Sequence, residues 1–151
     1  MRGVPLSALV LALAGVLPFL WGAGAALSLL PAEWENAAIL PRALARPDLL
    51  TFYGTIILCF MAGVLWGFAT RARGLRAAGA YLASVVPALW PFFMLGDGPA
   101  ADLLVLAFGF AGLLAFDWGF WRAGLAPAWW IRLRLPVTVI VVLCLLAGLA
   151  G

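Results

Sequence analysis

Asp117 is the acidic residue placed deepest inside an apolar segment, and its carboxylate is the group in this chain best suited to pair with a cation or a ligand. Residues 103–116 before it are apolar or glycine, and aromatic residues follow it. On membrane-insertion scales an aspartate at mid-helix costs about 2.5 to 3.5 kcal/mol, so it requires a partner or a water-filled setting. By helical rise it lies about 9 Å from the inner boundary of a core about 30 Å thick, within reach of Arg132 or Arg134.

Two interpretations of this carboxylate follow. In the functional one, a tryptophan, the aspartate and two arginines line a ligand pocket that faces the cytoplasm. These residues are Trp66, Asp117, Arg132 and Arg134, with Tyr53 and Trp90 as secondary candidates. In the structural one, an ion pair fastens the fourth apolar segment to the fifth. A proton relay would need further ionisable groups in series, and within the segments Tyr53 is the candidate we consider.

The composition argues against metal, redox and hydrolytic chemistry. Histidine is absent, which removes the commonest metal ligand and the usual general base near neutral pH. Cys59 and Cys144 lie in separate apolar segments without a CxxC spacing, so we expect no metal site. The sequence contains no G-x-S-x-G motif, phosphate-binding loop or carboxylate pair. We therefore expect no enzyme activity and no cofactor.

The elements that must position Asp117 are membrane spans. The 151 residues are 67% hydrophobic and 10% charged, against about 25% charged in an average soluble domain. All nine basic residues are arginines in short connections, so no solvated basic domain exists to bind nucleic acid. We expect an all-α integral membrane protein, a single domain of five helices that has the lipid bilayer as a partner. The predicted spans are 4–30, 49–70, 77–95, 103–121 and 129–150.

The segment 49–70 is the clearest span. It carries no charge and would cover about 33 Å as a helix. Its glycines, Gly54, Gly63 and Gly67, are predicted to serve helix packing, since the Gly63 and Gly67 pair leaves bare backbone one turn apart on one face. In the other spans we expect prolines to bend the helix, at Pro18 in the first and at Pro87 and Pro91 in the third.

The N-terminal segment has two interpretations. Arg2, the apolar run after it and two alanines in A-x-A register, Ala23 and Ala25, are typical of a signal peptide. The apolar run 4–30 exceeds the roughly 7 to 15 residues usual in such a peptide, which favours an uncleaved first span. The connection 31–47 is the longest polar one, and we expect a loop with or without a short surface helix.

Arginines in alternate connections predict the orientation. One side holds Arg2, Arg71, Arg73, Arg76, Arg122, Arg132 and Arg134, and the other holds Arg42 and Arg46. Since arginines near span ends are retained on the cytoplasmic side, we expect the N-terminus inside and the C-terminus outside.

Three stretches carry a resemblance to a known family: YGTIILCFMAGVLWGFA at 53–69, SVVPALW at 84–90 and APAWWIRLRLPVTVIVVLCLLAGL at 126–149. The chain resembles the domain of unknown function 3429 family, which includes the transmembrane protein 69 group, from about residue 13 almost to the C-terminus. Matching positions are Pro18, Tyr53, Gly54, Gly63, Trp66, Gly67, Pro87, Asp117, Trp129, Arg132, Arg134 and Thr138. Pro136 departs from the family pattern. The resemblance implies a small multi-span protein of bacterial inner membranes and mitochondria, without an established activity.

Two functions remain as hypotheses. The first is a non-enzymatic accessory or assembly partner of a larger complex in the bacterial inner membrane, suggested by small loops and close-packing glycines. The alternative is a binder or carrier of a hydrophobic small molecule, such as a quinone, lipid or tetrapyrrole, in an inward-facing intramembrane pocket. A membrane enzyme is the least supported hypothesis, because no nucleophile can be paired with a base.

Overall fold

The fold is known from a computed structural model that describes residues 3–31, 44 and 48–151, and these residues form helices and no strand. The long helices are α1 (Leu6–Ala26), α3 (Leu49–Ala69), α4 (Leu75–Met94), α5 (Pro99–Arg122) and α6 (Trp130–Ala147), and the short 3-10 helix η1 (Gly148–Ala150) continues α6. By length and composition, each of the five long helices can cross a membrane when η1 is counted with α6. The prediction of an all-helical, five-span membrane protein is therefore confirmed.

Local sequence explains several helix ends. α5 begins at Pro99 rather than at Leu103, because a proline at the first helical position has no N–H to leave unpaired. α4 follows Gly74, whose φ of 60° suits glycine and strains other residues. α1 ends at Ala26, short of the predicted Leu30.

The prolines inside helices leave those helices continuous. Pro18 lies in α1, Pro87 and Pro91 lie in α4, and Pro136 lies in α6. Each proline removes one backbone N–H donor from the helix. The third span is nevertheless helical throughout, and Pro87 and Pro91 are both buried.

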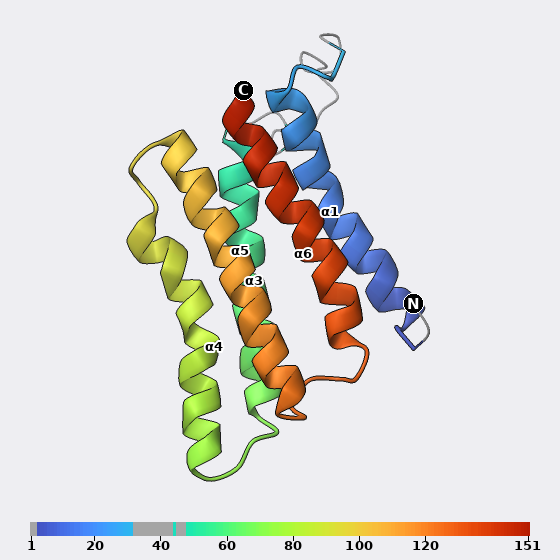
Figure 1. The fold of residues 1–151 in the computed structure, drawn as a ribbon, viewed down its shortest axis with the longest axis vertical. Helices are drawn as coiled ribbons and strands as arrows, with labels where there is room; N and C mark the ends of the chain where they lie inside the picture. The colour runs from blue at the N-terminus through green and yellow to red at the C-terminus, as the bar shows by residue number, and fades with distance from the viewer. Residues whose placement is uncertain (1–2, 32–43, 45–47) are drawn as a thin grey trace.

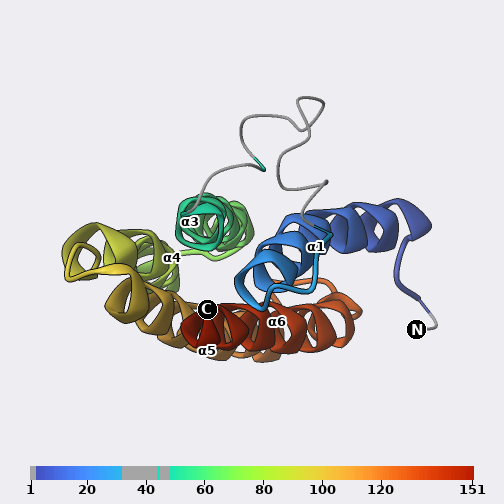
Figure 2. The same ribbon diagram turned by 90° about the horizontal axis from the view of Figure 1, so that it is seen from above.

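The helices form a bundle in which α1 and α4 lie at opposite edges (Figures 1 and 2). α3 contacts α1, α4 and α5, while α6 packs against α5 and α1. The core between them consists of leucine and phenylalanine side chains with almost no exposed surface. These include Phe19, Leu58, Leu65, Leu106, Phe110, Leu113 and Leu145.

Successive long helices run in opposite directions, so the two termini lie towards opposite ends of the bundle (Figure 1). At one end α3 and α5 finish and α4 and α6 begin, and we call this the arginine-rich end. Within the described ranges it holds every arginine: Arg71, Arg73, Arg76, Arg122, Arg132 and Arg134. The acidic residues described at the other end are Asp48, Asp97 and Asp102.

Some sequence predictions fall outside the described residues. They concern Arg2, Arg42, Arg46 and the short surface helix considered for the connection 31–47.

Candidate functional site

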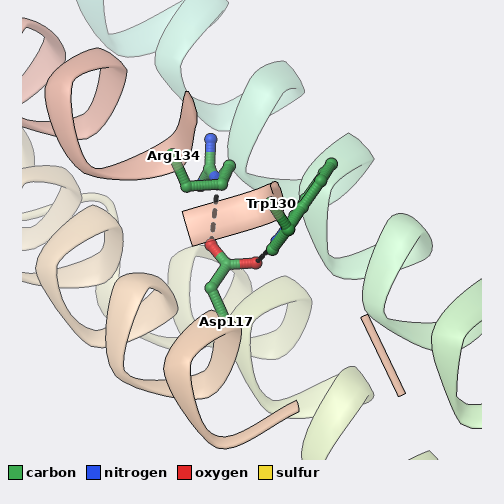
Figure 3. A network of polar contacts seen from close by, with 3 residues as sticks. All are labelled: Asp117, Trp130 and Arg134. Atoms are coloured by element: carbon green, nitrogen blue, oxygen red, sulfur yellow. Dashed lines mark hydrogen bonds and ion pairs between the residues drawn. The ribbon is translucent and has the colours of Figure 1, made fainter. Parts of the chain in front are cut away.

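Asp117 is completely buried and accepts two hydrogen bonds from α6. Trp130 Nε1 donates to Oδ1 at 2.7 Å, and Arg134 Nε donates to Oδ2 at 2.8 Å. Figure 3 shows the carboxylate with one oxygen directed at each donor. Trp130 and Arg134 are four positions apart and therefore lie one helical turn apart on the same face of α6. This spacing lets both side chains reach one carboxylate.

The guanidinium of Arg134 is almost as buried as its partner, since its side chain is 7% exposed. Its Nη2 has no hydrogen-bond partner among the described residues. One turn further along α6, Thr138 is also buried, and its Oγ1 likewise lacks a described partner. Buried polar atoms are usually hydrogen-bonded, so these two unpartnered atoms on one face of α6 require an explanation.

A cavity of about 360 Å³ lies beside Arg134 and Thr138, between α1, α3 and α6, and we call it the α1/α3/α6 cavity. Arg134 and Thr138 line it, together with apolar side chains that include Ala12, Val16, Met61, Val64, Phe110 and Val141. Two further lining residues, Leu11 and Phe60, are 72% and 63% exposed. The cavity therefore opens to the outer surface of the bundle, which faces lipid in a membrane.

The four residues predicted to share a site do not all meet. Asp117 and Arg134 form an ion pair, as the predicted depth of Asp117 in the membrane allowed. Arg132 is exposed and does not line the α1/α3/α6 cavity, because two residues along a helix correspond to about 200° of rotation. Trp66 is 50% exposed and packs against Tyr81 of α4 with ring centroids 4.7 Å apart. The prediction that Trp66 and Arg132 line this site is therefore wrong.

The two secondary candidates join helices and do not line the cavity. Tyr53 donates its hydroxyl hydrogen to the carbonyl oxygen of Gly15 at 3.1 Å, which links α3 to α1. Trp90 donates from Nε1 to the carbonyl oxygen of Val105 at 2.7 Å, which links α4 to α5. Neither residue borders the α1/α3/α6 cavity.

The three glycines of α3 differ in their surroundings. Gly54 is buried, and a Cβ there would lie 3.0 Å from Leu106 Cδ1, so α3 and α5 pack closely at this position. Gly63 and Gly67 are exposed, and a Cβ at either would meet nothing within 4 Å. The Gly63 and Gly67 pair therefore faces away from the bundle and packs no described helix.

Sequence reasoning missed the roles of Trp130 and Thr138 in this site. The signal that could have found them is spacing, because Trp130, Arg134 and Thr138 recur every four residues and so share one helical face. In the parts of the chain that the structure describes, no three histidine, cysteine or acidic side chains gather as metal ligands would. The two cysteines are not joined to each other: Cys59 is exposed and Cys144 is buried.

A protein-family model described as "Protein of unknown function (DUF3429)" matches residues 4–150. Comparison with curated proteins and with solved structures finds no significant match.

Proposed function

Because this chain belongs to the DUF3429 family, whose description names no activity, we propose a function from the geometry of the site. The protein binds a hydrophobic small molecule that presents a neutral hydrogen-bond acceptor inside the α1/α3/α6 cavity. The observation that supports this proposal is that Arg134 and Thr138, each of which carries a buried atom without a described partner, line an otherwise apolar cavity. A ligand that hydrogen-bonds to them would remove the cost of leaving them unsatisfied.

Size and access fit this proposal. Small-molecule sites usually measure about 300 to 1,000 Å³, and this cavity measures about 360 Å³. Its opening beside Leu11 and Phe60 lies on the apolar outer surface. A ligand dissolved in the bilayer could enter sideways from lipid, without crossing the polar ends of the bundle.

The charge of the site favours a neutral ligand. Asp117 already compensates the charge of Arg134, so a ligand carboxylate would add an unpaired negative charge to a poorly solvated space. A carbonyl oxygen accepts a hydrogen bond from Nη2 without adding charge. The hydroxyl of Thr138 can donate to a second acceptor. A quinone with an apolar tail supplies neutral carbonyl oxygens, and we propose it as the ligand class.

The test is equilibrium binding to the purified protein in mild detergent. The probe is a benzoquinone with a decyl tail, and decanoate is the charged comparison. We expect the quinone to bind more tightly than decanoate, and Thr138→Val to weaken quinone binding about fivefold, the effect of one ordinary hydrogen bond.

Blocking the cavity gives an independent readout. Ala12 lines the α1/α3/α6 cavity, so Ala12→Leu should fill it and abolish quinone binding. Ala14 lies on the same helix, is exposed and is not a lining residue, so Ala14→Leu should bind quinone like the wild type. Equal binding by the Ala12→Leu variant and the wild type would overturn the proposal, as would tighter binding of decanoate.

As a second candidate function, we propose that the protein is an accessory subunit of a larger membrane complex. The supporting observation is the outward-facing pair Gly63 and Gly67, where the backbone of another helix can approach closely. Blue-native electrophoresis of native membranes would test this proposal. Gly63→Leu should release the chain from a larger assembly, whereas Gly112→Leu, at another exposed glycine with open space around it, should not. Identical migration of both variants would remove this candidate.

We further propose that the arginine-rich end faces the cytoplasm of a bacterial cell and that the protein resides in the inner membrane. The arginines described at that end support this orientation through the positive-inside rule.

A further inference from the structure

A second hollow lies at the arginine-rich end between α4 and α5, and we call it the α4/α5 groove. Its volume is about 1080 Å³, and it shares no lining residue with the α1/α3/α6 cavity. The proposed function makes no use of it.

Most residues along the apolar part of the α4/α5 groove are small, and Phe116, Phe120 and Leu125 also line it. Ala80 and Ala83 come from α4, and Ala115, Gly119 and Ala123 come from α5 or its end. The last three recur every four residues, so they form one stripe along the face of α5 that borders the groove. Alanine and glycine fill little of the space between two helices. An apolar slot therefore runs along both helices, with room for a hydrocarbon chain.

Arginines line the polar part of the same groove. Arg71, Arg73 and Arg76 border it, and all three are exposed. Arg71 Nη1 donates to the carbonyl oxygen of Leu125 at 3.1 Å, which connects the start of this arginine cluster to the connection after α5. The one acidic residue described at this end is Asp117, which is buried and paired with Arg134. The positive charge beside the groove is therefore uncompensated by described acidic residues.

We infer that the α4/α5 groove binds an anionic phospholipid, with the phosphate at Arg73 and Arg76 and an acyl chain along the stripe of small residues. Charge complementarity selects the headgroup, and the apolar slot selects an attached tail, which a soluble phosphate lacks. Basic sites between transmembrane helices on the cytoplasmic side are suited to such headgroups, and anionic lipids are abundant in the cytoplasmic leaflet.

The headgroup is tested by lipid retention. The purified full chain is placed in nanodiscs that contain either phosphatidylglycerol or phosphatidylcholine with the same acyl chains, and the lipids that stay bound in detergent are counted by native mass spectrometry. We expect selective retention of phosphatidylglycerol. At about fivefold per arginine, the double change Arg73→Gln and Arg76→Gln should weaken retention about 25-fold. Arg122→Gln removes an exposed arginine from the same end but outside the groove, and it should have little effect.

Binding of the acyl chain along the groove is tested by substitutions that change no charge. A Cβ at Gly119 or at Gly112 would meet nothing within 4 Å, so both positions have open space for a larger residue, but only Gly119 lines the groove. Gly119→Leu should reduce phosphatidylglycerol retention, and Gly112→Leu should not. Soluble glycerol 3-phosphate should fail to displace the lipid. Equal losses of retention for Arg122→Gln and for Arg73→Gln or Arg76→Gln alone would overturn the inference in favour of general charge attraction. Unchanged retention in Gly119→Leu would overturn it as well.

Discussion

The Nε of Arg134 on α6 lies 2.8 Å from Oδ2 of Asp117 on α5, and both side chains are withdrawn from the surface. Two opposite charges at this distance compensate each other where neither water nor lipid headgroups can. The pair fixes the rotation of α6 relative to α5, because a turn of either helix would separate the two groups. Because Trp130 and Thr138 share the face of α6 that contains Arg134, the pair also sets the direction in which they point.

We predict that Asp117→Asn destabilises the bundle strongly, because it leaves the buried guanidinium of Arg134 without a counter-charge. Removing one partner of a buried ion pair typically costs about 3 to 5 kcal/mol. Thermal unfolding in detergent should show a larger loss than Arg122→Gln, which changes an exposed arginine.

A double-mutant cycle separates the ion pair from other effects of the substitution. Asp117→Asn combined with Arg134→Gln should recover part of the lost stability, since no unpaired buried charge then remains. Additive losses, or an unchanged melting temperature in Asp117→Asn, would contradict the importance assigned to this pair.

Trp130→Phe should destabilise the protein by about 1 to 3 kcal/mol, because Asp117 Oδ1 loses the donor that lies 2.7 Å away. The phenyl ring would keep the edge-to-face contact with Phe68, whose ring centroid lies 4.9 Å from that of Trp130. Trp129→Phe is the matched control, because Trp129 is only half-buried. Comparable melting temperatures for the two variants would argue against a role for the indole N–H.

Thr138→Val should leave the stability of the ligand-free protein unchanged or raise it slightly. The hydroxyl oxygen is buried without a described partner, so a methyl group of similar shape removes an unsatisfied atom rather than a hydrogen bond. Thermal unfolding without added quinone measures this effect. A clear loss of stability would mean that the hydroxyl is satisfied in the folded protein and would weaken the proposed ligand contact.

Gly109→Ala should lower the melting temperature, because the new methyl group would lie 2.8 Å from Leu58 Cδ2 and 2.9 Å from Trp90 Cδ1. Overpacking of this kind typically costs about 1 to 3 kcal/mol. Gly112→Ala on the same helix meets open space and gains helix propensity, so it should be neutral or stabilising. The reverse order of the two melting temperatures would show that α4 does not pack closely on α5 at Trp90.

Alkaline phosphatase fused after Gly151 should be active, because we expect the C-terminus outside the cytoplasm. Green fluorescent protein inserted in the connection 71–74 should fluoresce, because we expect this connection inside the cytoplasm. The prediction follows from the arginines at the end where α3 finishes and α4 begins. Paired alkaline phosphatase and green fluorescent protein fusions at both positions in intact bacterial cells measure it. A cytoplasmic C-terminus would invert the orientation and move the α4/α5 groove to the opposite leaflet.

The sequence by itself determined the five spans and the need of Asp117 for a partner. Hydropathy reports the free energy of transferring each segment from water to lipid. This free energy depends on the length and composition of the segment and not on neighbouring helices. Helical rise placed Arg132 or Arg134 within reach of Asp117, and the structure shows the ion pair with Arg134. α5 begins at Pro99 instead of the predicted residue 103, but the number of spans is as predicted.

Only the tertiary structure decided which face of each span packs inward. In a bilayer, lipid-facing and core-facing residues are both apolar, so hydropathy does not distinguish the two faces of a helix. Trp66 was therefore predicted to line a pocket, and the Gly63 and Gly67 pair to pack against another helix, yet all three lie on the outer surface of the bundle. The face of α6 that carries Trp130 and Thr138 borders side chains of α1, α3 and α5. Arg132 lies on the other side of α6 and is exposed.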